Sequence, residues 1–190
     1  MEFEQANANV EEIFSLYKKF GKEDYIGEPV SQIEHMCQAA QLAEEEGYDD
    51  EVILGAFFHD IGHLLEHIML VKQMDGYGVA DHETLAGEYL RQKGFSEKIA
   101  RLAENHVEAK RYLTYKFPEY YNKLSPASKI TLQKQGGAMD DMEAGLFEAD
   151  PIHQLYIKVR EWDDKAKVRN IPLPDLSLYK SMALEHLLSN

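Results

Sequence analysis

The apolar segment from Glu51 to His67 limits the folds open to this chain, because it carries a histidine-aspartate doublet in its middle. Its apolar residues recur at helical spacing and cover a wide face, which predicts a helix at the centre of a domain. His59 and Asp60 interrupt this face in the stretch GAFFHDIGHLLEH. Since a bare carboxylate in an apolar interior is costly, Asp60 has to be paired with another group or bound to a metal. The segment therefore predicts a helical core built around a polar centre.

Helical periodicity also dominates the rest of the chain, whereas the alternation typical of strands is scarce. We therefore predict an all-α fold that forms a single domain over residues 1–190. Start signals support this prediction, because Ser31 and Glu34 form a capping-box pattern and Ser125-Pro126 places a proline at the first helical position. The predicted helices cover about residues 10–20, 31–46, 51–67, 81–93, 96–108, 126–136, 140–148, 151–167 and 177–188, with a loop over 69–80.

The composition restricts the partners of the chain. Its 190 residues are 44% hydrophobic, which is sufficient for a buried core, and its formal net charge is −14. No run of Lys and Arg is present, which argues against nucleic acid and anionic membranes and favours a small charged metabolite. The lone Cys37, the lack of a signal-like N-terminus and the lack of an apolar run of roughly 18 residues predict a cytoplasmic protein without a membrane span.

Four of the eight histidines favour a metal site. They lie on separate predicted helices, beside apolar neighbours: His35, His59, His82 and His106. Each alone is more often a histidine that is hydrogen-bonded within the core, and a lone buried aspartate beside a histidine has the same explanation. Together with Asp60, however, the four imidazoles would each need a separate partner, and a shared metal site supplies one for all of them.

Helix geometry predicts a bridging role for Asp60. Adjacent residues of a helix point about 100° apart, so His59 and Asp60 do not naturally bind one ion side by side. A carboxylate that bridges two ions removes the difficulty, because His59 then binds one ion while Asp60 binds both. Nitrogen and oxygen ligands without thiolate suit iron, manganese or zinc rather than an iron–sulfur cluster, and the residues alone leave the choice among these three metals open.

The order of these residues resembles a known family. His35, His59-Asp60, His82 and His106 are similar to the H…HD…H…H pattern of the HD-domain metalloproteins, and Trp162-Asp163 resembles the aspartate that completes their dinuclear site. This resemblance implies an HD-domain helical bundle with a buried dinuclear metal site. Most HD domains are phosphohydrolases and a minority are diiron oxygenases, so the HD motif does not determine the reaction.

Longer stretches favour the oxygenases. EDYIGEPVSQIEH, HDIGH, DGYGVADHE, NHVEAKRYL, LSPAS, QGGAMD and VREWDDKAK resemble, in the same order, the mixed-valent diiron oxygenases that cleave organophosphonates. The similarity covers about residues 24–167, and it is more specific than the HD motif. One departure is Asn105, which precedes His106.

The resemblance implies a role for each matching residue. One iron is then held by His35, His59, Asp60 and Asp163, and the other by Asp60, His82 and His106. The phosphonate oxygens are bound by His63, Lys110, Ser128 and Arg160. Tyr25 occupies the iron site when substrate is absent, and Glu28 helps the loop to open when the cationic nitrogen of the substrate arrives. His67, His153 and His186 match no motif position.

Spacing independently favours three of the four phosphonate contacts. His63 follows His59 by four residues and Lys110 follows His106 by four, whereas Arg160 precedes Asp163 by three. Residues at these spacings share one face of a helix. The alternative for Lys110 and Arg160 is a solvated surface charge. In a chain of net charge −14, however, an anionic substrate needs local cations.

The resemblance implies a reaction that uses two Fe ions in the mixed-valent Fe(II)/Fe(III) state and O2 as co-substrate. The substrate implied is a small zwitterionic organophosphonate, 1-hydroxy-2-(trimethylammonio)ethylphosphonate or 1-hydroxy-2-aminoethylphosphonate, and the products are then phosphate with glycine betaine or glycine. Tyr25, Tyr77, Tyr112 and Glu28 are suited to either head group, and the number of aromatic residues favours the trimethylated one. The alternatives are an HD-type phosphohydrolase that acts on a phosphomonoester and a non-catalytic binding domain. The sequence makes no prediction of the oligomeric state.

Overall fold

Helices account for all the regular structure that the computed structural model describes, which covers residues 1–25 and 27–189. Within this part of the chain there is no strand, so the predicted all-α fold is confirmed. The α-helices are α1 (Phe3–Phe20), α2 (Gln32–Glu45), α3 (Asp50–Phe58), α4 (Ile61–Leu64), α5 (His82–Gln92), α6 (Glu97–Glu104), α7 (His106–Lys116), α8 (Tyr120–Lys123), α9 (Pro126–Lys134), α10 (Asp141–Ala149), α11 (His153–Lys165) and α12 (Ser177–Ser189), and the 3-10 helix η1 spans Leu65–His67. None of the helices in the described chain is long and apolar enough to cross a membrane.

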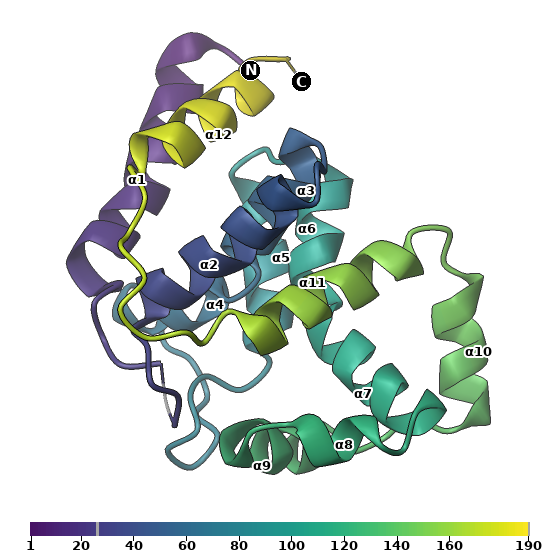
Figure 1. The fold of residues 1–190 in the computed structure, drawn as a ribbon. Coiled ribbons are helices and arrows are strands. Elements are labelled where there is room, and N and C mark those ends of the chain that lie inside the picture. Colours follow the sequence, from purple (N-terminus) through teal and green to yellow (C-terminus); the bar gives the residue numbers. More distant parts are fainter. Residues whose placement is uncertain (26, 190) are drawn as a thin grey trace.

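The centre of the molecule is formed by α2, α3, α6 and α11, which pack against one another (Figure 1). On one flank, α1 and α12 lie side by side although they are far apart in the sequence, whereas α8, α9 and α10 lie on the other flank (Figure 1). An aromatic cluster joins α1 and α12 to the centre, because Phe57 of α3 stacks on Tyr179 of α12 and on Phe14 of α1, with ring centroids 4.7 and 5.8 Å apart. The helices outside the region 24–167 therefore pack on the same core as the motif-bearing helices.

The segment that carries the His-Asp doublet is not one continuous helix, which corrects the prediction for residues 51–67. Helix α3 ends at Phe58, and the chain turns at Asp60, whose backbone has φ −105° and ψ 12°. Behind the turn, α4 lies against the start of α5 so closely that a Cβ on Gly62 would lie 1.9 Å from the carbonyl oxygen of His82. Tertiary packing of α4 on α5 therefore interrupts the helix that the apolar spacing predicts.

A second interruption corrects the prediction of a helix over 96–108. The chain leaves helical geometry at Asn105, with φ −102° and ψ 7°, so that α6 ends at Glu104 and His106 is the first residue of α7. The side-chain amide of Asn105 donates a hydrogen bond to the carbonyl oxygen of Arg101. Both corrections therefore lie beside candidate metal ligands, at helix boundaries that turn these side chains towards one another.

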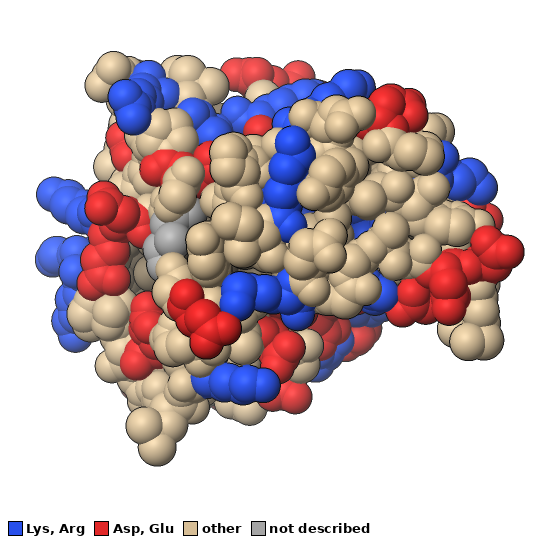
Figure 2. Space-filling view, turned by 90° about the horizontal axis from the view of Figure 1, so that it is seen from below, with Lys and Arg blue, Asp and Glu red and all other residues tan. Residues whose placement is uncertain are grey.

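The capping signals at Ser31 and Ser125 are confirmed, whereas Asp81 makes no side-chain capping hydrogen bond at the start of α5. Ser31 caps α2 in a capping box with Glu34, and Ser125 caps α9 with Pro126 at its first turn. The first helix begins earlier than predicted, at Phe3 rather than near residue 10. On the molecular face shown in Figure 2, Lys and Arg side chains are interspersed with Asp and Glu side chains.

Candidate metal centre and adjoining pocket

Four imidazoles converge on the carboxylate of Asp60. Its Oδ2 lies 3.4 Å from Nε2 of His35 and 3.4 Å from Nε2 of His59. Its Oδ1 lies 3.2 Å from Nε2 of His82 and 3.3 Å from Nε2 of His106. All five residues are buried. One oxygen of Asp60 thus faces each pair of histidines, which is the arrangement of a carboxylate able to bridge two ions.

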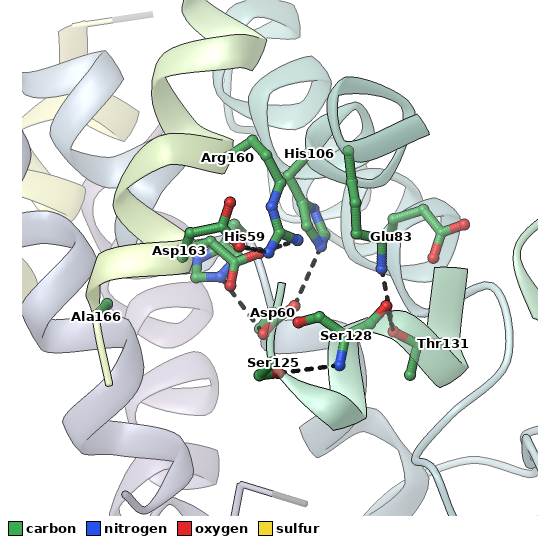
Figure 3. Close-up of polar contacts among 12 residues, drawn as sticks. His59, Asp60, Glu83, His106, Ser125, Ser128, Thr131, Arg160, Asp163 and Ala166 are labelled. Carbon is green, nitrogen blue, oxygen red and sulfur yellow. Dashed lines mark hydrogen bonds and ion pairs between the residues drawn. The ribbon is translucent and has the colours of Figure 1, made fainter. Parts of the chain in front are cut away.

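The ligand atoms form two buried groups, each compact enough to hold an ion. One group consists of His35, His59 and Asp163, and the other of Asp60, His82 and His106. Asp163 enters from α11, with its Oδ1 3.5 Å from Nε2 of His35 (Figure 3). The structure therefore brings together all six residues that the sequence predicts as metal ligands. The placement of these six residues supports a dinuclear metal site.

The hydrogen bonds of the first pair of histidines fit a cation between them. Nδ1 of His35 lies 2.9 Å from the carbonyl oxygen of Ala166, and Nδ1 of His59 lies 2.7 Å from that of Ala56. A carbonyl oxygen only accepts, so each Nδ1 carries the proton and each Nε2 of a neutral ring presents a lone pair. The two Nε2 atoms are nevertheless 3.0 Å apart. Two lone pairs at this distance repel each other, and a metal ion bound between them removes the repulsion.

The second pair shows the same arrangement. Nδ1 of His106 lies 2.7 Å from the carbonyl oxygen of Ala103, and its Nε2 lies 3.2 Å from Nε2 of His82. Nδ1 of His82 is 3.3 Å from Oε2 of Glu83, and neither of these two atoms has a hydrogen-bond partner of good geometry. Glu83 is therefore placed to orient His82 electrostatically, where the other three imidazoles of the centre use main-chain carbonyls.

The two aspartates supply the negative charge that a pair of cations requires. Burial raises the pKa of the Asp60 carboxyl, but the histidines around it, His59 above all, hold that pKa well below its usual range. Burial likewise raises the pKa of the Asp163 carboxyl, but Arg160, Lys167 and the neighbouring histidines together hold that pKa well below its usual range. Asp60 Oδ2 and Asp163 Oδ1 are buried without a hydrogen-bond donor. Four imidazoles and two ionised carboxylates with unused acceptor atoms fit two iron, manganese or zinc ions.

A pocket opens beside the candidate centre and encloses about 630 Å³ of empty space, including the solvent at its mouth. Its wall contains four of the candidate ligands together with residues of the 24–30 and 69–80 loops, α7 and α9. All the residues predicted to touch substrate line it: Tyr25, Glu28, His63, Lys110, Ser128 and Arg160. The structure therefore brings the predicted substrate contacts to the same cavity as the candidate metal ligands.

His63 has a defined tautomer in this wall. Its ring stacks on that of His82, with centroids 4.0 Å apart and planes at 18°. The backbone N–H of Val79 donates to its Nδ1 at 3.3 Å, which leaves the ring proton on Nε2. Burial, followed by the neighbouring His82, lowers the pKa of His63 to about 3. His63 is therefore a neutral donor of one hydrogen bond at physiological pH.

Two buried cations face the pocket. Lys110 donates to the hydroxyl of Thr131 at 3.1 Å, and burial, followed by the like charge of Arg160, lowers the pKa of Lys110 to about 7. Arg160 contacts the carboxylates of Asp163, at 2.6 Å, and Asp164 (Figure 3). Both side chains are about 3% exposed, which excludes the alternative of solvated surface charges.

Tyr25 and Glu28 reach the pocket from the loop before α2. The Tyr25 ring stacks on that of His35, with centroids 4.1 Å apart and planes at 14°. Burial and the Asp60 and Asp163 carboxylates raise the pKa of Tyr25 well above its usual value. Glu28 accepts a hydrogen bond from the hydroxyl of Ser125 at 2.5 Å.

Lys167 also reaches this part of the structure, and the sequence did not predict a role for it. Its Nζ donates to Glu28 at 2.9 Å, although Lys167 lies beyond the end of α11. It follows Asp163 by four residues, which is the spacing that drew attention to Lys110, but α11 ends before it. The course of the chain immediately after α11 brings Lys167 to the loop before α2.

The aromatic residues considered for the head group separate into two sets. Tyr77 lines the pocket with Tyr25, whereas Tyr112 donates to Glu148 at 2.6 Å and stacks on Phe147, away from the pocket. The expectation for Tyr112 is therefore wrong, because its hydroxyl is directed towards α10. The three histidines without a motif position, His67, His153 and His186, lie outside both buried ligand groups.

Comparisons with known proteins agree with this geometry. The model of the HD domain family matches residues 33–148. An uncharacterized protein of Acanthamoeba polyphaga mimivirus is 45% identical over 184 residues, covering 97% of this chain and 84% of the relative.

Two further relatives carry functional names. The [1-hydroxy-2-(trimethylamino)ethyl]phosphonate dioxygenase (glycine-betaine-forming) of Leisingera caerulea is 41% identical over 166 residues, covering 87% of this chain and 84% of the relative. The hydroxymethylphosphonate dioxygenase of Gimesia maris is 38% identical over 184 residues, covering 93% of this chain and 89% of the relative. The chain therefore belongs to the HD-domain family, in the group that includes these phosphonate dioxygenases.

Proposed function

We propose that this protein, as one HD-type domain, is an oxygenase that cleaves the C–P bond of a small 1-hydroxyphosphonate. The observation that carries the proposal is a buried set of four imidazoles and two carboxylates beside a pocket that contains two buried cations, Lys110 and Arg160. The names of the two phosphonate dioxygenases among its relatives support it. When bound, a mixed-valent Fe(II)/Fe(III) pair would supply the redox chemistry with O2 that a C–P bond requires, because this bond has no ester oxygen to leave.

The residues of the pocket match the charge of a phosphonate. Lys110 and Arg160 provide positive charge, Ser128 provides a hydroxyl, and the neutral His63 provides an N–H donor. Hydrogen bonds from charged donors to an oxyanion are the strong ones, and they also fix its orientation. We propose that these four residues hold the phosphonate oxygens while C1 faces the candidate metal ligands.

For the head group we propose a cationic nitrogen on C2, trimethylated or primary. The substrate is then 1-hydroxy-2-(trimethylammonio)ethylphosphonate or its 2-amino analogue, with Tyr25, Tyr77 and Glu28 near the nitrogen. An aromatic face and a carboxylate both attract an ammonium group. The balanced reaction consumes one O2, whose two oxygen atoms account for the difference between substrate and products, and yields phosphate, one proton and glycine betaine or glycine.

The test is turnover of these phosphonates by the iron-loaded, reduced protein. We expect phosphate and glycine betaine, or phosphate and glycine, to form in equal amounts, only in the presence of O2. Electron paramagnetic resonance is expected to show a coupled Fe(II)/Fe(III) signal that changes when the substrate is added. Phosphate release from a phosphomonoester without O2, in a protein that lacks this signal, would instead establish an HD-type phosphohydrolase.

Lys110 predicts a specific pH dependence of phosphonate binding. Its pKa in the free protein is about 7, so the cation that meets the phosphonate is present below pH 7 and is lost as the pH rises above it. We expect the dissociation constant to rise above pH 7, by at most about tenfold per pH unit. Calorimetric titrations between pH 6 and 9 measure this rise. Lys110→Arg is the control, since arginine stays charged and the titration of the ligand itself is common to both proteins. Parallel curves for both proteins would contradict this role of Lys110.

A further inference from the structure

An ammonium group of the protein itself lies where the proposed function places the cationic nitrogen of the substrate. Nζ of Lys167 is 2.9 Å from Oε1 of Glu28 and 5.9 Å from the centroid of the Tyr25 ring. It is also 3.4 Å from the hydroxyl of Ser128. The side chains of Lys167 and Glu28 are only 13% and 8% exposed. A carboxylate and an aromatic face, the two groups that would attract a substrate ammonium, are thus already shared with an internal one.

The backbone that carries each residue of this ion pair is held in place. Lys167 follows Ala166, which lies at the end of α11 (Figure 3). The carbonyl oxygen of Ala166 is 2.9 Å from Nδ1 of His35, so the main chain after α11 is tied to the candidate metal centre. On the loop, Gly27 has φ +76° and packs so closely on α9 that a Cβ would lie 2.8 Å from the Cβ of Ala127. The main chain therefore holds both residues in place, and only rotation of their side chains can separate the ion pair.

We infer that Lys167 determines specificity, because its ammonium group competes with the cationic nitrogen of a substrate for the Glu28 carboxylate. The inference rests on the proposed function. A second cation at the same carboxylate either displaces Lys167, which breaks the ion pair with Glu28, or shares the carboxylate with it against the repulsion of the like charge, and in both cases its binding is weaker. A phosphonate without a nitrogen meets no such competition. Lys167 thus reduces the preference of the pocket for phosphonates that carry a cationic nitrogen over phosphonates that lack one.

The experiment compares two ligands, 1-hydroxy-2-(trimethylammonio)ethylphosphonate and hydroxymethylphosphonate, which lacks the nitrogen. Their dissociation constants are measured by anaerobic calorimetry on the iron-loaded wild type, Lys167→Met, Lys167→Arg, Glu28→Gln and the double variant K167M/E28Q. Methionine keeps the length of the side chain without the charge, and arginine keeps the charge. Iron content and melting temperature show that each variant folds.

In Lys167→Met the preference for the cationic ligand is expected to rise at least about tenfold, since an uncompensated buried carboxylate then gains its partner from the ligand. Lys167→Arg keeps the wild-type preference, and Glu28→Gln lowers it. In the double variant the effect of Lys167→Met is expected to be smaller, because the carboxylate for which the two cations compete is absent and only their repulsion remains. An equal change for both ligands, or an undiminished effect beside Glu28→Gln, would overturn the inference and assign Lys167 to phosphonate binding or to the fold.

Titration with tetramethylammonium separates this inference from the proposed function. Tighter binding to Lys167→Met than to the wild type supports the inference even if no phosphonate is turned over, in which case only the proposed function fails. Equal tetramethylammonium affinities in the wild type, Lys167→Met and Glu28→Gln would overturn the inference even in a protein that cleaves phosphonates.

Discussion

Replacing Asp60 with asparagine is expected to remove most of the bound iron and, with it, the oxygenase activity. The carboxylate faces both pairs of histidines at 3.2–3.4 Å, so a single substitution removes the one negative charge that the two candidate ion sites share. Breaking a buried charge interaction by removal of one partner typically costs about 3–5 kcal/mol, which corresponds to a loss of metal affinity of roughly two to four orders of magnitude.

Iron per chain, measured by mass spectrometry after gel filtration, and phosphate release from the substrate test this expectation. Asp141→Asn is the matched control, because Asp141 is an exposed acid at the start of α10, and this variant is expected to keep the iron content and activity of the wild type. Full iron content and turnover in Asp60→Asn would show that Asp60 does not bridge the centre.

Replacing Gly62 with alanine is expected to destabilise the fold and to separate the two halves of the candidate centre. A Cβ at this position would lie 1.9 Å from the carbonyl oxygen of His82 and 2.7 Å from its carbonyl carbon. Both are backbone atoms, so α4 and α5 have to move apart, and with them Asp60 and His82. Overpacking of this kind typically costs about 1–3 kcal/mol.

The free energy of unfolding in urea and the iron content measure this effect. Gly145→Ala is the matched control, because Gly145 lies within α10 and a Cβ there would meet no atom within 4 Å. This variant is expected to gain about 0.5–1 kcal/mol from the higher helix propensity of alanine. A Gly62→Ala protein as stable as the wild type, with its full iron content, would contradict the role assigned to the contact between α4 and α5.

Local signals predicted most of the helices. The capping box at Ser31, the serine-proline pair at Ser125 and the apolar spacing of each segment act within one turn of helix, so their effect is visible in a single stretch of sequence. The candidate ligands could be predicted for a different reason. Several imidazoles and a carboxylate among apolar neighbours require a common partner, wherever the chain places them.

Contacts between distant segments account for what the sequence did not predict. The turn at His59-Asp60 depends on the approach of α4 to His82, which the apolar spacing of residues 51–67 does not contain. Lys167 reaches Glu28, 139 positions away, only through the course of the chain after α11. Tyr112 was predicted to lie in the substrate pocket because it is aromatic, but its ring packs on Phe147 outside that pocket.

Three of the four imidazoles are oriented by hydrogen bonds to main-chain carbonyl groups rather than to side chains. The acceptors for Nδ1 of His35, His59 and His106 are carbonyl oxygens of alanines, and a substitution at an alanine leaves its carbonyl in place. Mutation at these positions therefore cannot delete the groups that set the tautomers, as it can where an aspartate or glutamate holds the ring. Of the four rings, only His82, beside Glu83, depends on a neighbour that one codon change can remove. Substitution of Glu83 is thus expected to disturb the orientation of His82, whereas substitution of an alanine leaves the acceptor of the other rings in place.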